Sequence, residues 1–358
     1  YYYKMYIQEA DDVDGTVYYR YAQMLKANQK FDESNEAMKK FASKSPNDER
    51  AKAFKANPDY LPKLLSGDPK FTVDAISFNT ELSDFGGYEY NDKLYFVSAR
   101  NKSRRNYGWN DQPTLDVYVA TKENGEYQNP EELKGEVNSK YHEGTVSITP
   151  DGKTMFFTRN NYLDGDYEKS SEGIGKLKIY KANLVNGKWD DVQELPFNSD
   201  EYSTGHTALS PDGKTLYFSS DMPGGMGMSD LYKVSINEDG SFGEPENLGS
   251  SINTEARESF PYIDSEGTLY FSSDGQLGIG GLDVFYAKAD GDGFSSVKNM
   301  GQPINSTGDD FAFTFNINEE SGFVSSNRSG IEETVANDNI YLVMQIQPLD
   351  EIIVNSKV

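Results

Sequence analysis

The spacing of apolar residues along this chain changes near position 71. Between residues 17 and 56, apolar side chains recur every three to four positions, which predicts helices over Thr16–Ala27, Phe31–Ser43 and residues 47–56. From Phe71 onward, apolar and polar residues alternate, and turn dipeptides such as Asp-Gly separate the alternating segments. The pattern therefore predicts a small helical region followed by a larger β region.

The β region repeats one phrase. The heptapeptide Thr-Leu-Tyr-Phe-Ser-Ser-Asp occurs at Thr215–Asp221 and again at Thr268–Asp274. Weaker copies lie at Lys93–Ala99, Thr154–Asn160 and Gly322–Asn327. The copies recur every 53 to 61 residues, and the third copy can be read as four antiparallel strands between residues 206 and 248. The predicted fold class is therefore mainly β, with a five-bladed β-propeller.

A second phrase, an apolar residue followed by Asn and then Ser or Thr, repeats in phase with the first. Its asparagines are Asn79, Asn138, Asn198, Asn253 and Asn305. The last blade lacks an outer strand of its own, so a strand over 72–78 is predicted to pair with Asp338–Gln345 and close the ring. The predicted domains are a helical region over 1–66, the propeller over 67–346, and a linker over 347–358 to a following domain.

Four aspartates recur just before the third strand of their blades. They are Asp116, Asp230, Asp283 and Asp338. A carboxylate at the end of a loop suits the capping of backbone N–H groups. A ring of calcium or substrate ligands is the alternative, but it would require one residue per blade to point at the axis. We therefore interpret these aspartates, and the five asparagines, as structural.

Two glycine-rich loops occupy matching places in two blades, at Gly224–Gly227 and Gly278–Gly281. Neither has the spacing of a dinucleotide loop or the Lys-Ser/Thr ending of a phosphate loop, and neither opens a helix. Their matching places indicate a shared loop geometry that requires positive φ.

Composition narrows the chemistry. The chain has 34 basic and 58 acidic side chains, for a formal net charge of −24, which disfavours nucleic acid as a partner. It has no cysteine, which excludes thiol chemistry and zinc sites built on cysteine. Its only histidines are His142 and His206, which disfavours a Ser/His/Asp catalytic relay. No apolar run reaches the length of a transmembrane helix. We expect no enzymatic activity, cofactor or metal.

An insertion between the second and third strands of the first blade carries an unusual group of side chains for an acidic protein. Its basic and aromatic residues are Lys102, Arg104, Arg105, Tyr107 and Trp109. Arginine and aromatic residues dominate binding hot spots, so this loop is a candidate partner-binding site. The alternative is a solvated loop with one packed tryptophan.

The order of elements resembles a known family. Ala22, the Phe31–Ser34 segment and Pro46 match a tetratricopeptide-like (TPR) helix pair, and Phe41 departs from that pattern. The repeats at Ser210–Tyr232 and Gly267–Phe294 then resemble the PD40 (WD40-like) propellers of Bacteroidetes OmpA-family proteins.

The resemblance implies a protein of the periplasm, associated with the outer membrane, in a family that anchors type IX secretion and gliding motility complexes to peptidoglycan. It also implies envelope partners, such as an outer-membrane PorP/SprF-like protein or other type IX secretion components. Peptidoglycan itself would be bound through a C-terminal domain that is absent from this sequence.

Three functions compete at this point. The first is a non-catalytic scaffold that docks envelope proteins through its propeller and TPR modules. The second is a TolB-like propeller whose axial channel receives a peptide of a peptidoglycan-associated partner. The third is a propeller hydrolase, for which the sequence supplies no coherent acid, base and nucleophile.

Overall fold

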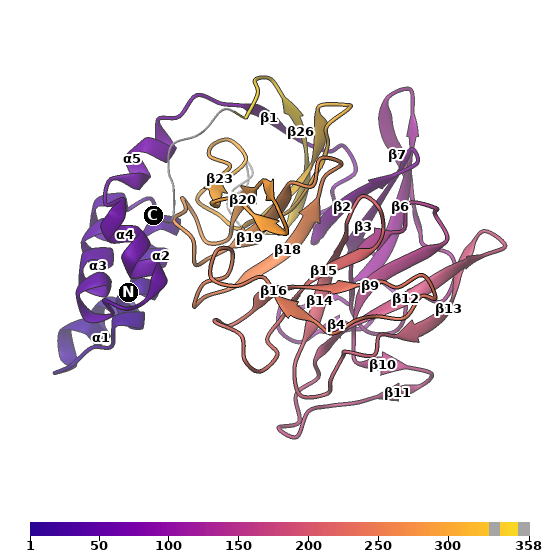
Figure 1. Ribbon diagram of the computed structural model, residues 1–358, viewed down its shortest axis with the longest axis horizontal. Helices are drawn as coiled ribbons and strands as arrows, with labels where there is room; N and C mark the ends of the chain where they lie inside the picture. Colours follow the sequence, from indigo (N-terminus) through magenta and orange to yellow (C-terminus); the bar gives the residue numbers. More distant parts are fainter. Residues whose placement is uncertain (329–336, 350–358) are drawn as a thin grey trace.

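The computed structural model describes residues 1–328 and 337–349, and places a helical module beside a ring of β-sheets (Figure 1). The helices of the module are α1 (Tyr2–Glu9), α2 (Gly15–Ala27), α3 (Phe31–Lys44), α4 (Glu49–Ala56) and α5 (Tyr60–Leu65). Helix α2 begins where the side chain of Asp14 accepts the backbone N–H of Thr16, and α4 begins at the same kind of cap on Asp48. None of the helices in the described residues is long and apolar enough to cross a membrane.

Two helices lie outside those predicted from the sequence. Helix α1 precedes the segment whose apolar residues recur at helical spacing, and it buries none of its residues. Helix α5 contains Pro62, a residue type that interrupts a helix at an interior position. Pro62 is in the first turn, where a helix has no partner for a backbone N–H, and there the ring is tolerated.

Five four-stranded antiparallel sheets form the described part of the propeller, which confirms the predicted fold class. Blade 1 contains β2 (Asp84–Tyr90), β3 (Lys93–Ser98), β6 (Asp116–Glu123) and β7 (Glu126–Glu132); blade 2 contains β8 (Glu143–Ile148), β9 (Thr154–Asn160), β12 (Leu177–Val185) and β13 (Lys188–Glu194). Blade 3 contains β14 (Thr204–Leu209), β15 (Thr215–Ser220), β16 (Asp230–Ser235) and β17 (Glu246–Asn247); blade 4 contains β18 (Glu258–Ile263), β19 (Leu269–Ser273), β20 (Asp283–Ala287) and β23 (Lys298–Asn299).

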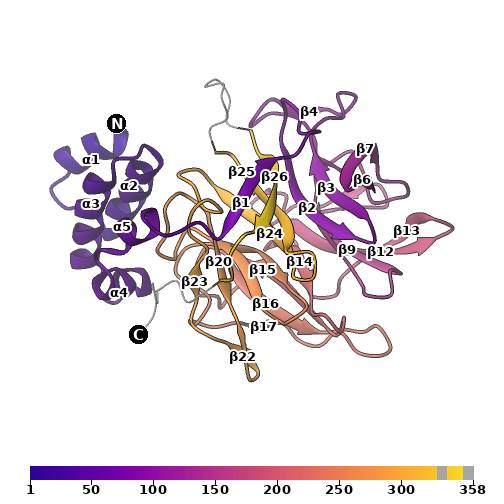
Figure 2. The same cartoon turned by 90° about the horizontal axis from the view of Figure 1, so that it is seen from above.

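Blade 5 is completed by a strand from the other end of the β region. It contains β24 (Asp310–Asn316), β25 (Ser321–Ser326), β26 (Asn339–Gln345) and, outermost, β1 (Phe71–Ala75). The two strands β1 and β26 are antiparallel, with Phe71 opposite Gln345 and Ala75 opposite Tyr341 (Figure 2). The closing strand is therefore present, but it spans 71–75 and not 72–78.

Short hairpins decorate three blades. They are β4 (Asn106–Tyr107) with β5 (Gln112–Pro113), β10 (Tyr162–Leu163) with β11 (Asp166–Tyr167), and β21 (Ala289–Asp290) with β22 (Gly293–Phe294). Of the linker expected over 347–358, Leu349 packs against the core of blade 5, and residues 350–358 lie outside the described residues.

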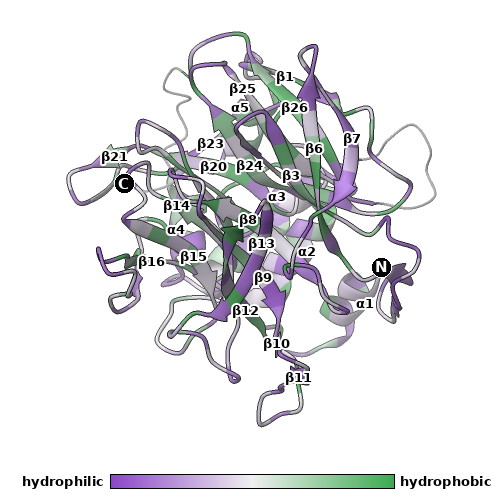
Figure 3. Cartoon of the chain, turned by 90° about the vertical axis from the view of Figure 1, so that its right-hand side faces the viewer, coloured by the Kyte–Doolittle hydropathy of each residue, from purple (hydrophilic) through white to green (hydrophobic). Residues whose placement is uncertain are grey.

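Each pair of neighbouring blades shares an apolar core. Phe157 of blade 2 packs in one cluster with Tyr95 of blade 1, for example, and Phe323 of blade 5 packs in another with Phe96 of blade 1. Figure 3 views the ring from the side opposite the helices, with the sheets arranged around a common centre. The apolar residues that alternate along the strands thus form the walls between blades.

Candidate docking face

Strand direction divides the ring into two faces. In an antiparallel blade, the loop between the second and third strands emerges on the same side as the link to the next blade. We call this side the link face. It carries the five repeated asparagines, the insertion of blade 1 and the glycine-rich loops, and the helical module contacts it.

The repeated asparagines hold each link onto the blade that precedes it. In every blade, the Asn side chain accepts the N–H and donates to the C=O of one residue on the third strand. The pairs are Asn79 with Ile340, Asn138 with Val117, Asn198 with Ile179, Asn253 with Leu231, and Asn305 with Val284, at 2.7–3.1 Å. Asn79 follows β1 and binds Ile340 of β26, so β1 occupies the place of a fourth strand.

The repeated aspartates have three different environments. Asp230 accepts the N–H groups of Met226 and Gly227, and Asp283 accepts that of Gly280. Asp116 instead accepts side-chain groups of the blade 1 insertion. Asp338 lies one residue before the matching place, which Asn339 occupies opposite Ser326, so the predicted repeat is wrong for blade 5. Burial raises the pKa of Asp338 to about 6, opposed by a hydrogen bond from Ser83. Blade 2 has Lys178 at the matching place, between Glu194 and Asp200 at 2.8 Å each.

A further set of contacts is not apparent from the repeated phrases. The backbone carbonyl just before each asparagine accepts a hydrogen bond from a long side chain of the following blade, which lies in its second strand, in the loop after that strand or in the link. The donors are Arg100 to Phe78, Arg159 to Val137, Tyr202 to Phe197, Gln276 to Ile252 and Arg328 to Ile304. Because the donors differ in residue type, no single sequence motif marks all five. Only the three arginines share a feature that a motif search could detect, namely a position near the end of the second strand or just after it.

The three arginines also pair with a buried carboxylate that begins the inner strand. The pairs are Arg100 with Asp84 at 2.7 Å, Arg159 with Glu143 at 3.1 Å, and Arg328 with Asp310 at 2.6 Å. In blade 4 the carboxylate is Glu258, and the arginine is replaced by Gln276. Glu258 accepts hydrogen bonds from Thr254 and Ser273 and has no cation beside it in the described residues. Burial raises its pKa to about 7, opposed by those hydrogen bonds.

Glu258 is expected to make stability depend on pH. The folded state keeps the Glu258 proton up to about pH 7, whereas the unfolded chain loses it near pH 4.3, so this residue's contribution to stability falls as pH rises between those values. Glu258→Gln removes the titration. Its free energy of unfolding, relative to the parent, should rise by about 3 kcal/mol between pH 5 and pH 8.

Urea unfolding at several pH values measures this difference. Glu238→Gln, in an exposed turn, is the matched control and should follow the parent at every pH. A constant difference between Glu258→Gln and the parent would show that Glu258 is ionised throughout this range.

The insertion of blade 1 separates into an anchored part and an exposed part. Arg104 binds the buried carboxylate of Asp116, with its Nη2 2.8 Å from Oδ1, so Arg104 is a structural ion pair within the blade. Lys102 forms only an exposed pair with Glu81. The exposed remainder contains Arg105, the half-exposed Tyr107 and Trp109, of which 89% is exposed.

The hairpin of β4 and β5 presents these exposed side chains. The Tyr107 ring packs edge-on against the ring of His142, with centroids 4.7 Å apart. Partial burial lowers the pKa of His142. Trp109 lies at the tip of the hairpin, between Tyr107 and Gln112, which pair as neighbouring strand residues. A tryptophan this exposed has no role in the core of the described structure, and its position suits contact with another protein.

The helical module is seated on the loop between β19 and β20 of blade 4. Along one side of α2, Tyr19 and Gln23 donate to the carbonyl of Asp274, and Lys26 donates to the carbonyl of Gly278 at 2.9 Å. The N–H of Glu49 donates to the carboxylate of Glu255, in the link before blade 4. Burial lowers the pKa of Lys26, and the charge of the nearby Asp283 opposes that shift.

The same loop supplies apolar side chains to the helical core. Leu277 and Ile279 are buried in one cluster with Phe41 of α3, Phe54 of α4 and Leu64 of α5. The core of the helical module is therefore completed by the propeller, so the two parts form one packed unit.

The axis of the ring is closed by aromatic rings. His206 stacks on Phe260 with centroids 3.8 Å apart, and Phe260 contacts Phe311, which contacts Phe85. These four residues come from four inner strands, each of which has a register shift at this point. The remaining axial cavity is about 30 Å³, enough for about one water molecule.

A pocket of about 280 Å³ lies above this closure on the link face. Its lining includes His206, Phe260, Arg257 and Met228. Burial lowers the pKa of His206 to about 4, so the ring is neutral at pH 7. Its Nδ1 lies 3.2 Å from the Ser219 hydroxyl. His142 and His206 lie in different blades and have separate partners, and no three metal-binding side chains converge in the described parts of the chain.

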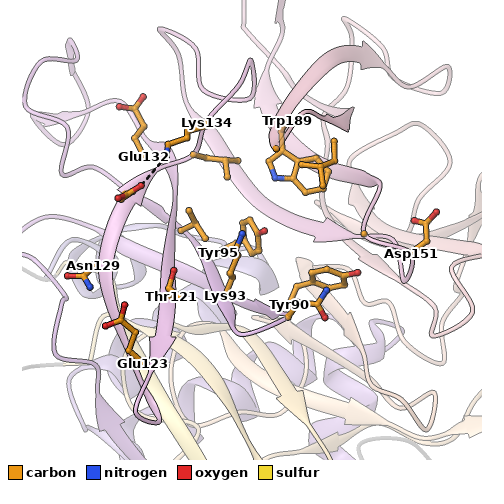
Figure 4. A pocket seen from close by; sticks show the side chains of 17 residues that line it. Tyr90, Lys93, Tyr95, Thr121, Glu123, Asn129, Glu132, Lys134, Asp151 and Trp189 are labelled. Atoms are coloured by element: carbon orange, nitrogen blue, oxygen red, sulfur yellow. Dashed lines mark ion pairs between the residues drawn. The ribbon is translucent and has the colours of Figure 1, made fainter.

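A hollow of about 760 Å³ lies on the opposite face between blades 1 and 2 (Figure 4). Buried Tyr95, Leu133 and Trp189 form its floor. Charged residues of both signs, including Glu132 and Lys134, form its rim. An apolar floor with an open polar rim is typical of a surface that receives another molecule.

Comparisons with known proteins bear on the fold only. No protein-family model and no curated protein matches this chain. Among solved structures, it is similar to an alpha-L-arabinofuranosidase from Lactobacillus brevis, with 13% sequence identity and a TM-score of 0.45 over 79% of this chain and 92% of that one. It is also similar to a thermostable family-43 glycoside hydrolase, with 14% identity and a TM-score of 0.45 over 76% of this chain and 95% of that one. It is also similar to a puromycin-hydrolyzing peptidase of Mycobacterium tuberculosis (13%, 0.35, 68% of this chain), of which it spans only 35%.

Proposed function

We propose that this protein is a non-catalytic periplasmic scaffold, associated with the outer membrane, that docks envelope or secretion proteins on its link face. The resemblance to PD40-containing OmpA-family proteins supports the compartment and the class of partner, and within that family the chain is most like PorE of the type IX secretion system. Its partners would be a PorP/SprF-like outer-membrane protein or other type IX secretion components, and a following domain would attach the assembly to peptidoglycan.

One observation carries the docking proposal: the exposed Arg105, Tyr107 and Trp109 stand together on a hairpin whose base is fixed by Arg104 and Asp116. Tyrosine and tryptophan lose little conformational entropy on binding, and together with arginine they are the residue types that dominate hot spots.

A TolB-like function is the second candidate, and the pocket at the axial mouth supports it. Because the axial cavity below this pocket is only about 30 Å³, a peptide would bind at the mouth and would not thread the ring. Substituting Phe260 with alanine would then weaken binding of the peptide, while substitutions in the hairpin of β4 and β5 would leave it unchanged.

The triple variant Arg105→Ala/Tyr107→Ala/Trp109→Ala tests the hairpin. Arg104 is left unchanged, because its removal would leave the buried Asp116 without its cation. Loss of a hot spot of about 2 kcal/mol corresponds to roughly thirtyfold weaker binding, so recovery of co-purifying envelope proteins should fall at least tenfold.

A pull-down of the tagged chain from native envelopes, with quantitative identification of the bound proteins, provides the measurement. The control is Met344→Ala, which removes an exposed apolar side chain from β26, away from the hairpin and from the pockets described above. Equal recovery by the triple variant and the parent would reject the hairpin as the docking site.

A further inference from the structure

In the glycine-rich loop of blade 3, Met222–Ser229, residues 225–227 have the same contacts as residues 278–280 in the loop of blade 4 on which the helical module sits. Before them the loops differ, because Gly224 has a φ of +92° and its counterpart Leu277 does not have a positive φ. Asp230 accepts N–H groups of Met226 and Gly227, as Asp283 accepts that of Gly280. A Cβ on Gly227 would meet the carbonyls of Thr254 and Ala256 at 2.4 Å. Its counterpart Gly280 has the same relation to the carbonyls of Ser306 and Gly308, at 2.5 and 2.2 Å.

Each residue of the blade 4 loop that contacts the helical module has a counterpart in the blade 3 loop. Asp221 corresponds to Asp274, whose carbonyl binds Tyr19 and Gln23, and Gly225 corresponds to Gly278, whose carbonyl binds Lys26. In blade 3, no hydrogen bond from a described residue reaches the carbonyl of Asp221 or Gly225. The loop that is covered in blade 4 is open in blade 3.

The apolar contacts of the two loops are also related. Met226 takes the place of the buried Ile279 and is only partly buried, and the neighbouring Met228 is 57% exposed. Gly224 takes the place of Leu277, so blade 3 presents fewer side chains to a partner core. Methionine adapts to partners of varied shape. Blade 3 thus offers a smaller version of the surface that the helical module covers on blade 4.

We propose that the blade 3 loop binds one amphipathic helix of another protein, in the manner in which α2 binds blade 4. The partner helix would carry an aromatic or amide residue that donates a hydrogen bond and a lysine further along the same side. In α2 these residues are Tyr19, Gln23 and Lys26, with the lysine seven positions after the tyrosine. The basic residue of the partner helix would approach the carbonyl of Gly225, close to the buried carboxylate of Asp230. This inference rests on the proposed docking function and names a second site for it.

A stapled helical peptide covering residues 14–28 of this chain is the probe, because it carries Tyr19, Gln23 and Lys26. Fluorescence anisotropy with the full chain should show binding, since the chain's own helix already occupies blade 4. Met226→Asp in the chain, and Lys26→Glu in the peptide, should each weaken binding at least tenfold. Met344→Asp, at an exposed site on β26, should leave binding unchanged.

Two results would overturn the site. The first is no binding of a peptide that circular dichroism shows to be helical; the second is equal binding by the Met226→Asp chain. A photocrosslinker at position 226 in native envelopes adds an independent readout, which should join the chain to a partner segment that is helical and contains a lysine. If the hairpin variant loses partners while Met226→Asp retains them and the peptide does not bind, the scaffold function stands and the blade 3 site falls.

Discussion

Phe71→Ala should lower the free energy of unfolding by about 4 kcal/mol, the cost typical of removing a buried phenylalanine. Phe71 begins β1 and is fully buried against Phe313 and Phe315, with ring centroids 6.2 and 5.7 Å away. Because β1 pairs with only one neighbouring strand, β26, burial of the Phe71 side chain contributes much of the free energy that holds β1 on the ring. Urea unfolding followed by the fluorescence of the buried Trp189 measures the loss.

Thr72→Ala is the matched control, because Thr72 lies in the same strand and is exposed. It should change the free energy of unfolding by less than about 1 kcal/mol. If Phe71→Ala behaved like Thr72→Ala, then β1 would contribute little to the closure of blade 5.

Ile279→Asp should release the helical module from the propeller. Ile279 is fully buried in the helical core, and a carboxylate there would lie among Phe41, Phe54 and Leu64 without a partner. A buried, unpaired charge costs more than about 3 kcal/mol, so the side chain is expected to leave the core and break the contact. Limited trypsin digestion should then cut at Lys70, between the two parts, far faster than in the parent.

Met226→Asp makes the same substitution at the matching position of blade 3, where the side chain is only partly buried. Its digestion should resemble that of the parent. Equal protection of Ile279→Asp and the parent would mean that the polar contacts of Tyr19, Gln23 and Lys26 hold the module without the apolar ones.

The ring could be predicted from the sequence because each blade repeats the same local pattern. The phrase that ends at Asp221 and Asp274 marks a second strand, and the unmatched outer strand of the last blade predicts that the chain closes on itself. The asparagines are visible for the same reason, since one geometry requires one residue type. Local repetition is what a single sequence reports well.

The contacts of the docking face were beyond such reasoning because they join distant segments without repeating. Tyr19 reaches a carbonyl 255 positions away. The donors to the link carbonyls include Tyr202 and Gln276 as well as arginines, so no residue type marks the position. Arg104 resembles a free binding residue in the sequence, and only its 2.8 Å distance to Asp116 shows that it is already paired.

The closing strand also decides how the protein responds to mechanical load. The helical module continues into β1 at Phe71, and Phe71 lies opposite Gln345, the last residue of β26. Once the module is released from blade 4, tension between the module and the residues after β26 would therefore pull on adjacent ends of two antiparallel strands. In that direction the hydrogen bonds of the pair break one after another and do not share the force, so the ring would open at its seam before any other blade was stretched.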